Sequence, residues 1–168
     1  AERYRFKPDK YYGAAICISG SEMHGLLVGI CGEILETCRL EFTGDDYEPA
    51  ITAYLDELMA RKDIKSIGIG VPGIVEDGSF WKGSGSSRHD LGDRLAGRYH
   101  IPIVMENDLN ATAIGFGRCY AREFPCEAPD LTNMAYLHLE KTCVSAGFIV
   151  GGRVVRGFRN FAGELGLV

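Results

Sequence analysis

The sequence predicts an α/β protein, with one complete domain built on a mixed sheet and the beginning of a second α/β domain. Apolar runs of strand length alternate with runs of helical periodicity over most of the chain. One such run, Ile101 to Met105, leads straight into a predicted helix. Near the end of the chain, a Gly-Gly pair between two β-rich runs indicates a hairpin outside that series. At 168 residues and 46% hydrophobic content, the chain can bury a real core.

The first predicted elements are three strands and a helix. Tyr12 to Ile18, His24 to Ile30 and Glu33 to Phe42 are β-rich runs separated by turns that contain glycine. Asp46 can cap the helix that follows. The apolar residues of this helix follow the i, i+3, i+4, i+7, i+8 spacing of a buried face: Ile51, Tyr54, Leu55, Leu58 and Met59. We therefore expect this helix to pack on the core without taking part in chemistry.

The next strand, Ile64 to Val71, alternates β-branched residues with glycine. Gly68 and Gly70 leave one face of this strand bare, which favours a close neighbour there. The strand ends in a tight turn at Pro72 and Gly73. The run from Gly78 to Ser87 is then expected to be a polar surface loop anchored by Trp81; stacking of Trp81 on a sugar ring is the less favoured alternative.

A strand and a helix meet at the most informative point of the chain. After a predicted helix from Leu91 to Tyr99 and the strand from Ile101 to Met105, Asn107 and Asp108 open another helix. Open α/β sheets bind ligands at the carboxyl ends of their strands, where the following helix directs its positive end outward. Asn107 and Asp108 are therefore either a simple helix cap or part of a ligand site.

The last third of the chain predicts a second sheet. The segment from Ala121 to Thr132 contains two prolines and three acidic residues and is the expected connection. Met134 to Leu139 and a hairpin within Phe148 to Val155 follow as strands with no helices of their own to cover them. We expect an exposed apolar face, hence self-association, and the candidates for that face are Phe148, Val150, Val154 and Phe158. The glycine-rich loop that comes next offers one carboxylate, Glu164.

Composition narrows the classes of function. The net charge of −5 opposes direct nucleic-acid binding, which usually needs a basic face. No apolar run approaches the roughly 18 residues that cross a bilayer, and no secretion leader is evident, so a cytoplasmic protein without membrane contact is expected. The six cysteines form no C-x2-C pair and the four histidines have no partner acid at diagnostic spacing, so we expect free thiols and no metal site.

Three motifs, taken in order, resemble those of the ROK family of bacterial sugar kinases and sugar-responsive repressors. They are G-x-G-[VI]-P-G at Gly68 to Gly73, E-N-D-x-N-A at Glu106 to Ala111, and A-G-E-[IL]-G at Ala162 to Gly166. The resemblance covers nearly the whole chain. It implies a ribonuclease-H-like fold of the actin-like ATPase type, in which a sugar lies in the cleft between two α/β domains. It also implies that Asn107, Asp108 and Glu164 hydrogen-bond the sugar and that Gly73 is a further ligand-binding residue.

The kinase branch of this family has two phosphate-binding loops, from which the sequence departs. Where the first loop of the family reads D-x-G-G-T-K, Cys17 replaces the Asp, Ser19 the first Gly, and Glu22 adds a negative charge. In the second loop, from Lys141 to Gly147, only Thr142 and the last glycine match the family pattern. The resemblance therefore favours a protein without a nucleotide cofactor, in which Asp108 matches the catalytic base of the kinases but serves only as an acceptor.

The beginning of the chain favours the regulator branch. Residues 1–11 resemble the linker that follows a winged-helix DNA-binding domain in ROK repressors, although a poorly ordered basic leader is the alternative. Residues 12–120 are then the first ROK domain, 121–133 the connection and 134–168 the start of the second. The expected function is the sugar or sugar-phosphate effector domain of a regulator that contacts DNA only through a missing winged-helix domain. A ROK sugar kinase with atypical phosphate loops is the first alternative, and a scaffold without a ligand the second.

The resemblance also bears on metal binding. ROK proteins commonly hold a structural zinc ion through a His directly after A-G-E-x-G and three later cysteines. Leu167 stands at the position of that His. A zinc site of the family type is therefore not expected.

Overall fold

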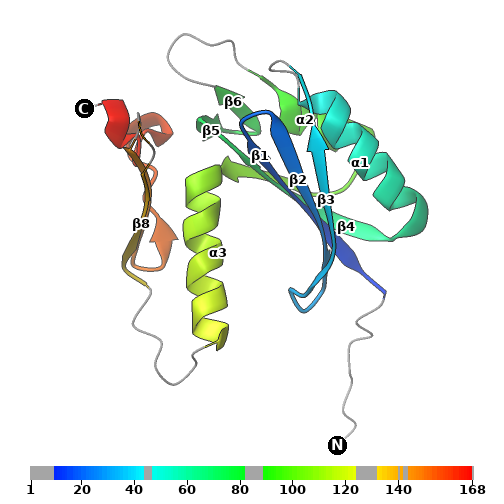
Figure 1. Ribbon diagram of the computed structural model, residues 1–168, viewed down its shortest axis with the longest axis horizontal. Helices are drawn as coiled ribbons and strands as arrows, with labels where there is room; N and C mark the ends of the chain where they lie inside the picture. Colours follow the sequence, from blue (N-terminus) through cyan, green and yellow to red (C-terminus); the bar gives the residue numbers. More distant parts are fainter. Residues whose placement is uncertain are drawn as a thin grey trace, which may run out of the picture.

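The computed structural model describes residues 10–43, 47–81, 89–123, 132–139, 141 and 144–167. Its larger sheet has five strands in the order β3-β2-β1-β4-β7 (Figure 1). An antiparallel meander is followed by two strands parallel to β1, and the five strands are β1 (Tyr12–Ser19), β2 (Glu22–Gly29), β3 (Ile34–Glu41), β4 (Ile64–Val71) and β7 (Ile103–Asn107). The predicted strands are confirmed with shifts of one or two residues at their ends.

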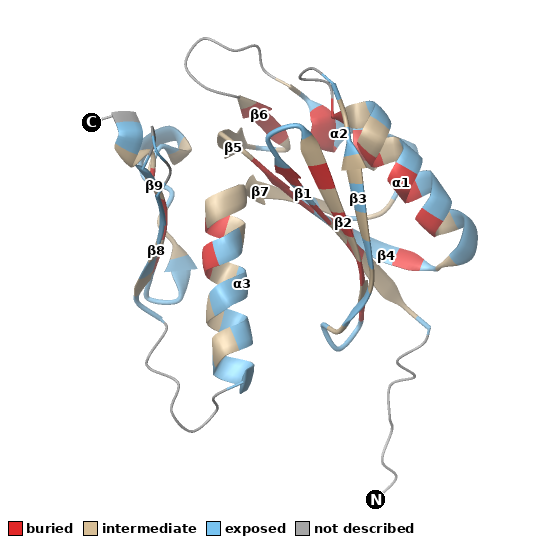
Figure 2. Ribbon diagram, viewed as in Figure 1, coloured by how far each residue is buried: buried red, intermediate tan, exposed pale blue. Residues whose placement is uncertain are grey.

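The core lies between one face of this sheet and two helices, α1 (Glu48–Arg61) and α2 (Leu91–Tyr99). Figure 2 shows the buried residues concentrated on these strands and on the helix sides that meet them. The predicted inner face of α1 is confirmed, since Ile51, Tyr54, Leu55 and Leu58 are buried and Met59 packs against them in part. Asp46, the predicted cap, lies outside the described residues.

A two-stranded hairpin was not predicted. β5 (Ile74–Glu76) pairs with β6 (Ser79–Trp81) across a turn in which Asp77 and Gly78 have φ values of 48° and 75°. An Asp-Gly pair with both φ values positive is the preferred two-residue hairpin turn, so the signal was present in the sequence. Phe80, the middle residue of β6, is buried, and its ring stacks on that of His89 with the ring centroids 4.8 Å apart.

The expected polar loop from Gly78 to Ser87 is corrected in part by this hairpin. Its first residues form β6, because Phe80 rather than Trp81 supplies the buried anchor, and Trp81 is only half-buried. The expectation for residues 82–87 lies outside the described part of the chain.

Helix α3 (Asp108–Glu123) stands between the larger sheet and a second sheet of three strands (Figure 1). The second sheet has the order β10-β9-β8, with β8 (Met134–Leu139), β9 (Val144–Val150) and β10 (Arg153–Val154). Two short 3-10 helices follow, η1 (Phe158–Asn160) and η2 (Leu165–Leu167). α3 also extends to Glu123, into the predicted connection, because Ala121 and Arg122 continue the helix favourably.

The expectation that nothing covers the second sheet is wrong for one of its faces. Gly147 on β9 meets α3 so closely that an added Cβ would lie 2.5 Å from the Leu109 carbonyl oxygen. On the far side, Leu137, Leu139 and Val150 are 57%, 71% and 60% exposed. Of the residues predicted for an exposed apolar face, Val150 and Phe158 are exposed, whereas Phe148 and Val154 are half-buried. In the described part of the chain, no helix is both long and apolar enough to span a membrane.

Candidate functional site

Asn107 joins three segments at the carboxyl end of the larger sheet. Its Oδ1 atom accepts hydrogen bonds from the backbone N–H groups of Leu109 and Asn110, both at 3.0 Å. Its Nδ2 atom donates to the Gly73 carbonyl at 2.9 Å. The helix-cap interpretation is thus correct for Asn107. Because the amide oxygen already accepts two bonds, what the side chain can still offer a ligand is an N–H donor.

Gly73 has the backbone conformation that only glycine adopts easily, with a φ of 102°. That conformation turns its carbonyl toward Asn107. The turn after β4 is thereby tied to the end of β7. Gly70 lies three residues earlier, on β4. A close neighbour was predicted at its bare face, and an added Cβ would lie 3.7 Å from the Asp108 Cα atom. At Gly68 nothing lies within 4 Å, so that bare position has no such neighbour among the described residues.

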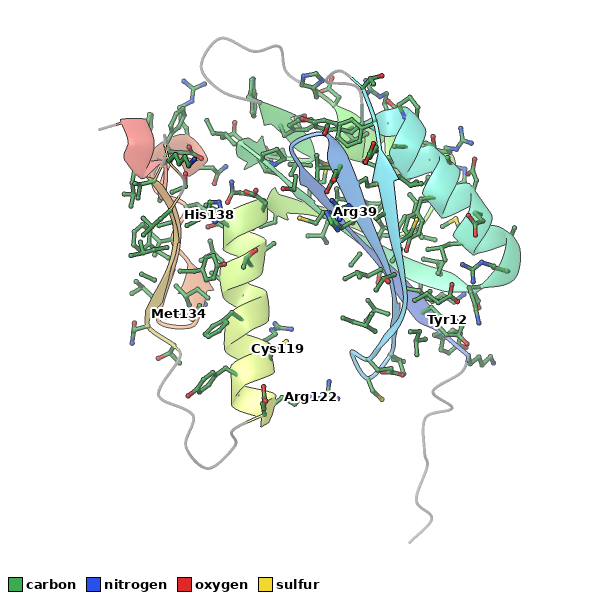
Figure 3. All side chains as sticks on the ribbon, viewed as in Figure 1. Tyr12, Arg39, Cys119, Arg122, Met134 and His138 are labelled. Carbon is green, nitrogen blue, oxygen red and sulfur yellow. The ribbon has the colours of Figure 1, made fainter. Side chains whose placement is uncertain are left out.

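Asp108 is the first residue of α3 and is half-buried. One of its carboxylate oxygens accepts from the Leu109 N–H at 2.9 Å. Burial raises the pKa of the Asp108 carboxyl, although hydrogen bonds from the helix backbone and the charge of His138 act in the opposite direction. His138 lies on β8 beside the first turn of α3 (Figure 3). The site therefore contains a histidine that the sequence spacing did not single out.

Glu164 comes from the glycine-rich loop after the second sheet. Gly163, with a φ of 98°, brings this loop against β9, where its carbonyl accepts from the Ala146 N–H at 2.8 Å. Burial and then the charge of Asp108 raise the pKa of the Glu164 carboxyl. The two carboxyl groups therefore lie close enough to feel each other's charge, although they are carried by different sheets.

A cleft of about 630 Å³ separates α3 from the face of the larger sheet opposite α1. Its lining includes Asp108, Glu106 and Arg156, with small residues of β1 and β4 between them. That volume suits a small ligand. A second hollow of about 710 Å³ lies between α3 and β10 but is lined by none of the predicted ligand residues. We regard the first as the candidate site because Asp108, one of the predicted ligand residues, lines it.

At the turn between β1 and β2, the expected replacements of the phosphate-loop residues lie on one surface. Glu22 is paired with Arg39 and lies 3.4 Å from the His24 imidazole. The hydrogen bond from Arg39 lowers the pKa of the Glu22 carboxyl, so this side chain is an anion at neutral pH. Burial and the charge of Asp108 raise the pKa of the Cys17 thiol, which holds Cys17 in its neutral form.

The segment that resembles a second phosphate loop, Lys141 to Gly147, overlaps strand β9. Residues 144–147 belong to β9, because Val144 to Gly147 pair in regular register with Leu139 to Tyr136 of β8. Positions 142 and 143 lie outside the described residues. Among the described residues, no group of three or more His, Cys, Asp or Glu side chains is arranged to hold a metal ion.

Two charged residues at the site were not selected from the sequence. Glu106 belongs to the E-N-D motif but received no role, and its carboxylate pairs with Arg156. Glu106 could have been found from its place at the strand end. Arg156 could not, since it lies 50 positions away and no local pattern distinguishes it from other exposed arginines.

Proteins similar to this chain include both regulators and enzymes. A putative xylose repressor of Caldicellulosiruptor sp. is 33% identical over 113 residues, which are 63% of this chain and 26% of the repressor. The glucokinase of Halalkalibacterium halodurans is 23% identical over 171 residues, covering 94% of this chain and 49% of the enzyme. The chain thus spans less than half the length of either relative.

A solved ROK family transcriptional regulator, a homologue of the E. coli MLC protein, has the same fold. It matches 94% of this chain with a TM-score of 0.73 at 20% identity, and 41% of the regulator is covered. The predicted ribonuclease-H-like, actin-like ATPase fold is thereby confirmed. The sequence profile of the ROK family matches residues 13–168. With this match over almost its entire length, the chain belongs to the ROK family.

Proposed function

We propose that this chain is the sugar-binding part of a ROK-type transcriptional regulator and has no kinase activity. The observation that carries the proposal is the proximity of Glu164, on the loop after the second sheet, to Asp108, which lines a cleft of suitable size. Within the described part of the chain, neither carboxyl group is paired with a lysine or an arginine. Both are thus able to accept hydrogen bonds from a ligand.

Sugars match this arrangement chemically. Neighbouring hydroxyl groups of a sugar are donors that two adjacent carboxylates can accept, while the Asn107 amide supplies an N–H to an oxygen of the ring or a hydroxyl group. Gly73 contributes by holding Asn107 in place. The names of similar proteins, a xylose repressor and a glucokinase, suggest D-xylose and D-glucose as the first sugars to test.

The absence of kinase activity is proposed from the turn between β1 and β2. Glu22 brings a negative charge to the position where the kinases of this family bind phosphate, and a carboxylate 4 to 5 Å from a phosphate costs roughly 1 to 4 kcal/mol. Arg39 compensates part of that charge but is itself engaged by Glu22. Cys17, held neutral, cannot provide the charge that helps to hold magnesium in the kinases.

The proposed partners are a sugar or sugar-phosphate effector, DNA through a winged-helix domain, and a second copy of the protein. Self-association is supported by the exposed apolar side chains of Leu137, Leu139 and Val150 on the outer face of the second sheet. Sedimentation at about 100 μM should give a species larger than the monomer, and Leu139→Lys should shift it toward the monomer. A monomer in both cases would remove self-association from the proposal.

A ROK sugar kinase is the second candidate. It is favoured by the raised pKa of Asp108, because a carboxylate with a raised pKa is a better general base for a sugar hydroxyl. In that case Asp108 would take the proton of the attacking hydroxyl group. The two candidates therefore differ in the need for ATP, and both use the same carboxylate.

Calorimetry with D-xylose and D-glucose tests the sugar site. Asp108→Ala and Glu164→Ala should each weaken binding by about 1 to 3 kcal/mol, since each leaves polar groups unpaired. Asp63→Ala is the matched control: this exposed carboxylate precedes β4, at the opposite end of that strand. Unchanged affinity in both site variants would reduce Asp108 to a helix-terminal residue. Magnesium-dependent ATP consumption that a sugar stimulates and Asp108→Asn abolishes would establish the kinase instead.

A further inference from the structure

The loop that carries Glu164 has an unfavourable backbone. Between positions 157 and 163, four residues have positive φ values, namely Gly157 at 65°, Arg159 at 53°, Asn160 at 61° and Gly163 at 98°. Glycine adopts such values freely, whereas in an arginine the Cβ atom crowds the backbone in this conformation. A loop of this kind persists only where contacts with its surroundings determine it.

Backbone hydrogen bonds hold both ends of this loop to each other and to β9. The Ala162 N–H donates to the Arg156 carbonyl at 3.0 Å, and the Ala146 N–H donates to the Gly163 carbonyl at 2.8 Å. These bonds attach the loop to the second sheet. The second sheet in turn meets α3 at Gly147, but neither of these two bonds reaches the Glu106–Asp108 end of the larger sheet.

The side chain of Arg156 makes that second connection. Its guanidinium donates to the Glu106 carboxylate on β7, directly before the Asn107-Asp108 pair. The other oxygen of Glu106 accepts from the Asn107 N–H at 3.1 Å and from the Asn110 side chain at 3.2 Å. Glu106 is therefore fixed to the first turn of α3 before it meets Arg156.

We propose that the Glu106–Arg156 ion pair is a latch that positions Glu164 against Asp108, and hence that both residues are positioning residues for the site. What the site binds rests on the proposed function. The latch itself rests on contacts between residues of the protein. Arg156 stands at the base of the loop that carries Glu164. Its partner Glu106 lies two positions before Asp108, so the ion pair links the segments that carry the two carboxyl groups.

An ordinary surface ion pair contributes too little to stability for this role, because both charges stay well solvated. Glu106 differs because its side chain is only 15% exposed and accepts hydrogen bonds at both oxygens. Removing Arg156 leaves that charge in a poorly solvated place without its cation. The loop then loses its link to the end of β7 while its bonds to the second sheet remain.

The first test is made without any sugar, by NMR titration of the Glu164 carboxyl carbon in the wild-type chain and in Arg156→Ala. If the latch is lost, Glu164 moves away from Asp108 and becomes more hydrated, so its raised pKa should fall toward the ordinary value of 4.5. Simple loss of a nearby positive charge would shift the pKa in the opposite direction, upward. The sign of the shift therefore separates positioning from electrostatics.

Arg98→Ala is the matched control for this titration. Arg98 also pairs with a carboxylate, that of Asp56 at 2.6 Å, but it lies on α2 at the other face of the larger sheet. It should leave Glu164 unchanged. Arg156→Lys keeps the charge without the planar fork and should give an intermediate shift. An unchanged or increased pKa of Glu164 in Arg156→Ala overturns the latch.

The second test is a double-mutant cycle on binding of D-xylose and D-glucose. Glu106→Gln keeps an acceptor for Asn107 and Asn110 but removes the charge that Arg156 meets. Each single variant should weaken binding about tenfold. The double variant should lose no more affinity than the more strongly affected single variant, because all three variants remove the same link. Independent, additive losses contradict the latch. A lowered Glu164 pKa in Arg156→Ala, with no binding of either sugar by the wild type, supports the latch and refutes the proposed choice of sugars.

Discussion

The two sheets on either side of α3 are stabilised by different kinds of contact. Toward α1 and α2, the larger sheet buries a continuous set of large apolar side chains, among them Ile18, Met23 and Leu27. Beyond α3, the second sheet buries few apolar side chains in the described residues, and the buried ones are Ala146 and Ile149. Its position depends instead on a close backbone contact at Gly147, on the hydrogen bonds of a strained loop, and on the Glu106–Arg156 pair.

This difference separates stability from ligand recognition. A core of branched side chains resists local opening, whereas a unit held by a few specific contacts opens at a lower free energy. The carboxyl groups of the site come one from each side of this boundary. We therefore expect substitutions in the first region to change global stability, and substitutions in the second to change the geometry of the site.

The largest effect on stability should come from Leu55→Ala. Leu55 lies on α1 and is fully buried against the sheet, so the cavity left by the substitution should lower the free energy of unfolding by about 2 to 5 kcal/mol. Urea-induced unfolding measures this loss. Ile149→Ala is the counterpart in the second sheet. It should lower the global value by less than about 1 kcal/mol while it speeds amide exchange across β8 and β9. Equal losses of global stability would show that the two regions unfold as one unit.

Next in size should be Gly147→Ala, which attacks the boundary itself. The new methyl group would meet backbone atoms of α3, which cannot move aside as a side chain can, at a cost of about 1 to 3 kcal/mol. Gly68→Ala is the matched control on β4, because nothing lies within 4 Å of its added Cβ. It should stay within about 0.5 kcal/mol of the wild type. Denaturant unfolding of both variants compares them, and similar losses would argue against the close contact.

A smaller effect, of opposite sign, is expected from Arg159→Gly. Glycine relieves the positive φ of 53° at this position but gains freedom in the unfolded chain, so the net stabilisation should be about 0.5 to 1 kcal/mol. Asn160→Gly should gain less, because asparagine tolerates this conformation better than arginine. Amide exchange of the 157–163 loop is the measurement. Slower exchange in Asn160→Gly than in Arg159→Gly would contradict the strain assigned to Arg159.

The smallest effect should appear as a dependence on pH. Because burial raises the pKa of Asp108 above its ordinary value of 3.8, folding disfavours the charged carboxylate and stability falls as the pH rises through this range. Asp108→Asn should therefore raise the free energy of unfolding at pH 7. It should leave stability unchanged below about pH 3, where the carboxyl is protonated in both states.

Asp56 provides a control of opposite sign. Hydrogen bonds from Tyr99 and Arg98 lower the pKa of the Asp56 carboxyl, so its contribution is present at neutral pH and is lost as the pH falls through the lowered pKa. Asp56→Asn should consequently reduce stability at pH 7 and not at low pH. Chemical unfolding of both variants at pH 3 and pH 7 measures the two signs. A loss in Asp108→Asn at pH 7 would mean that its hydrogen bonds outweigh the cost of burial.

Patterns within short stretches predicted most of the elements. The 3.6-residue period of α1 and the Gly-Gly turn between β9 and β10 were both readable, because each depends on neighbours in the chain. Asp77-Gly78 carries an equally local hairpin signal. The strand predicted to begin at Phe148 begins at Val144, because Val144 to Gly147, which resemble part of a phosphate loop, pair with β8.

The candidate site could be predicted only in part. Asn107, Asp108 and Glu164 were identified by motif, and the raised pKa of both carboxyl groups follows from burial that no spacing reveals. The second sheet was expected to be bare because it brings no helix of its own. In the structure α3, which ends the first series of elements, covers it.

The sequence by itself determined the strands, the helices and the identity of the residues at their ends, because hydrophobic period, glycine turns and helix caps act over a few residues. Only the tertiary structure decided which of those ends meet. Glu106 and Arg156 are 50 positions apart, and Asp108 and Glu164 are brought together by the packing of Gly147 against α3 and by the turn at Gly163. Contacts of this kind depend on the path of the whole chain, so their energies appear only once the two sheets are placed on either side of one helix.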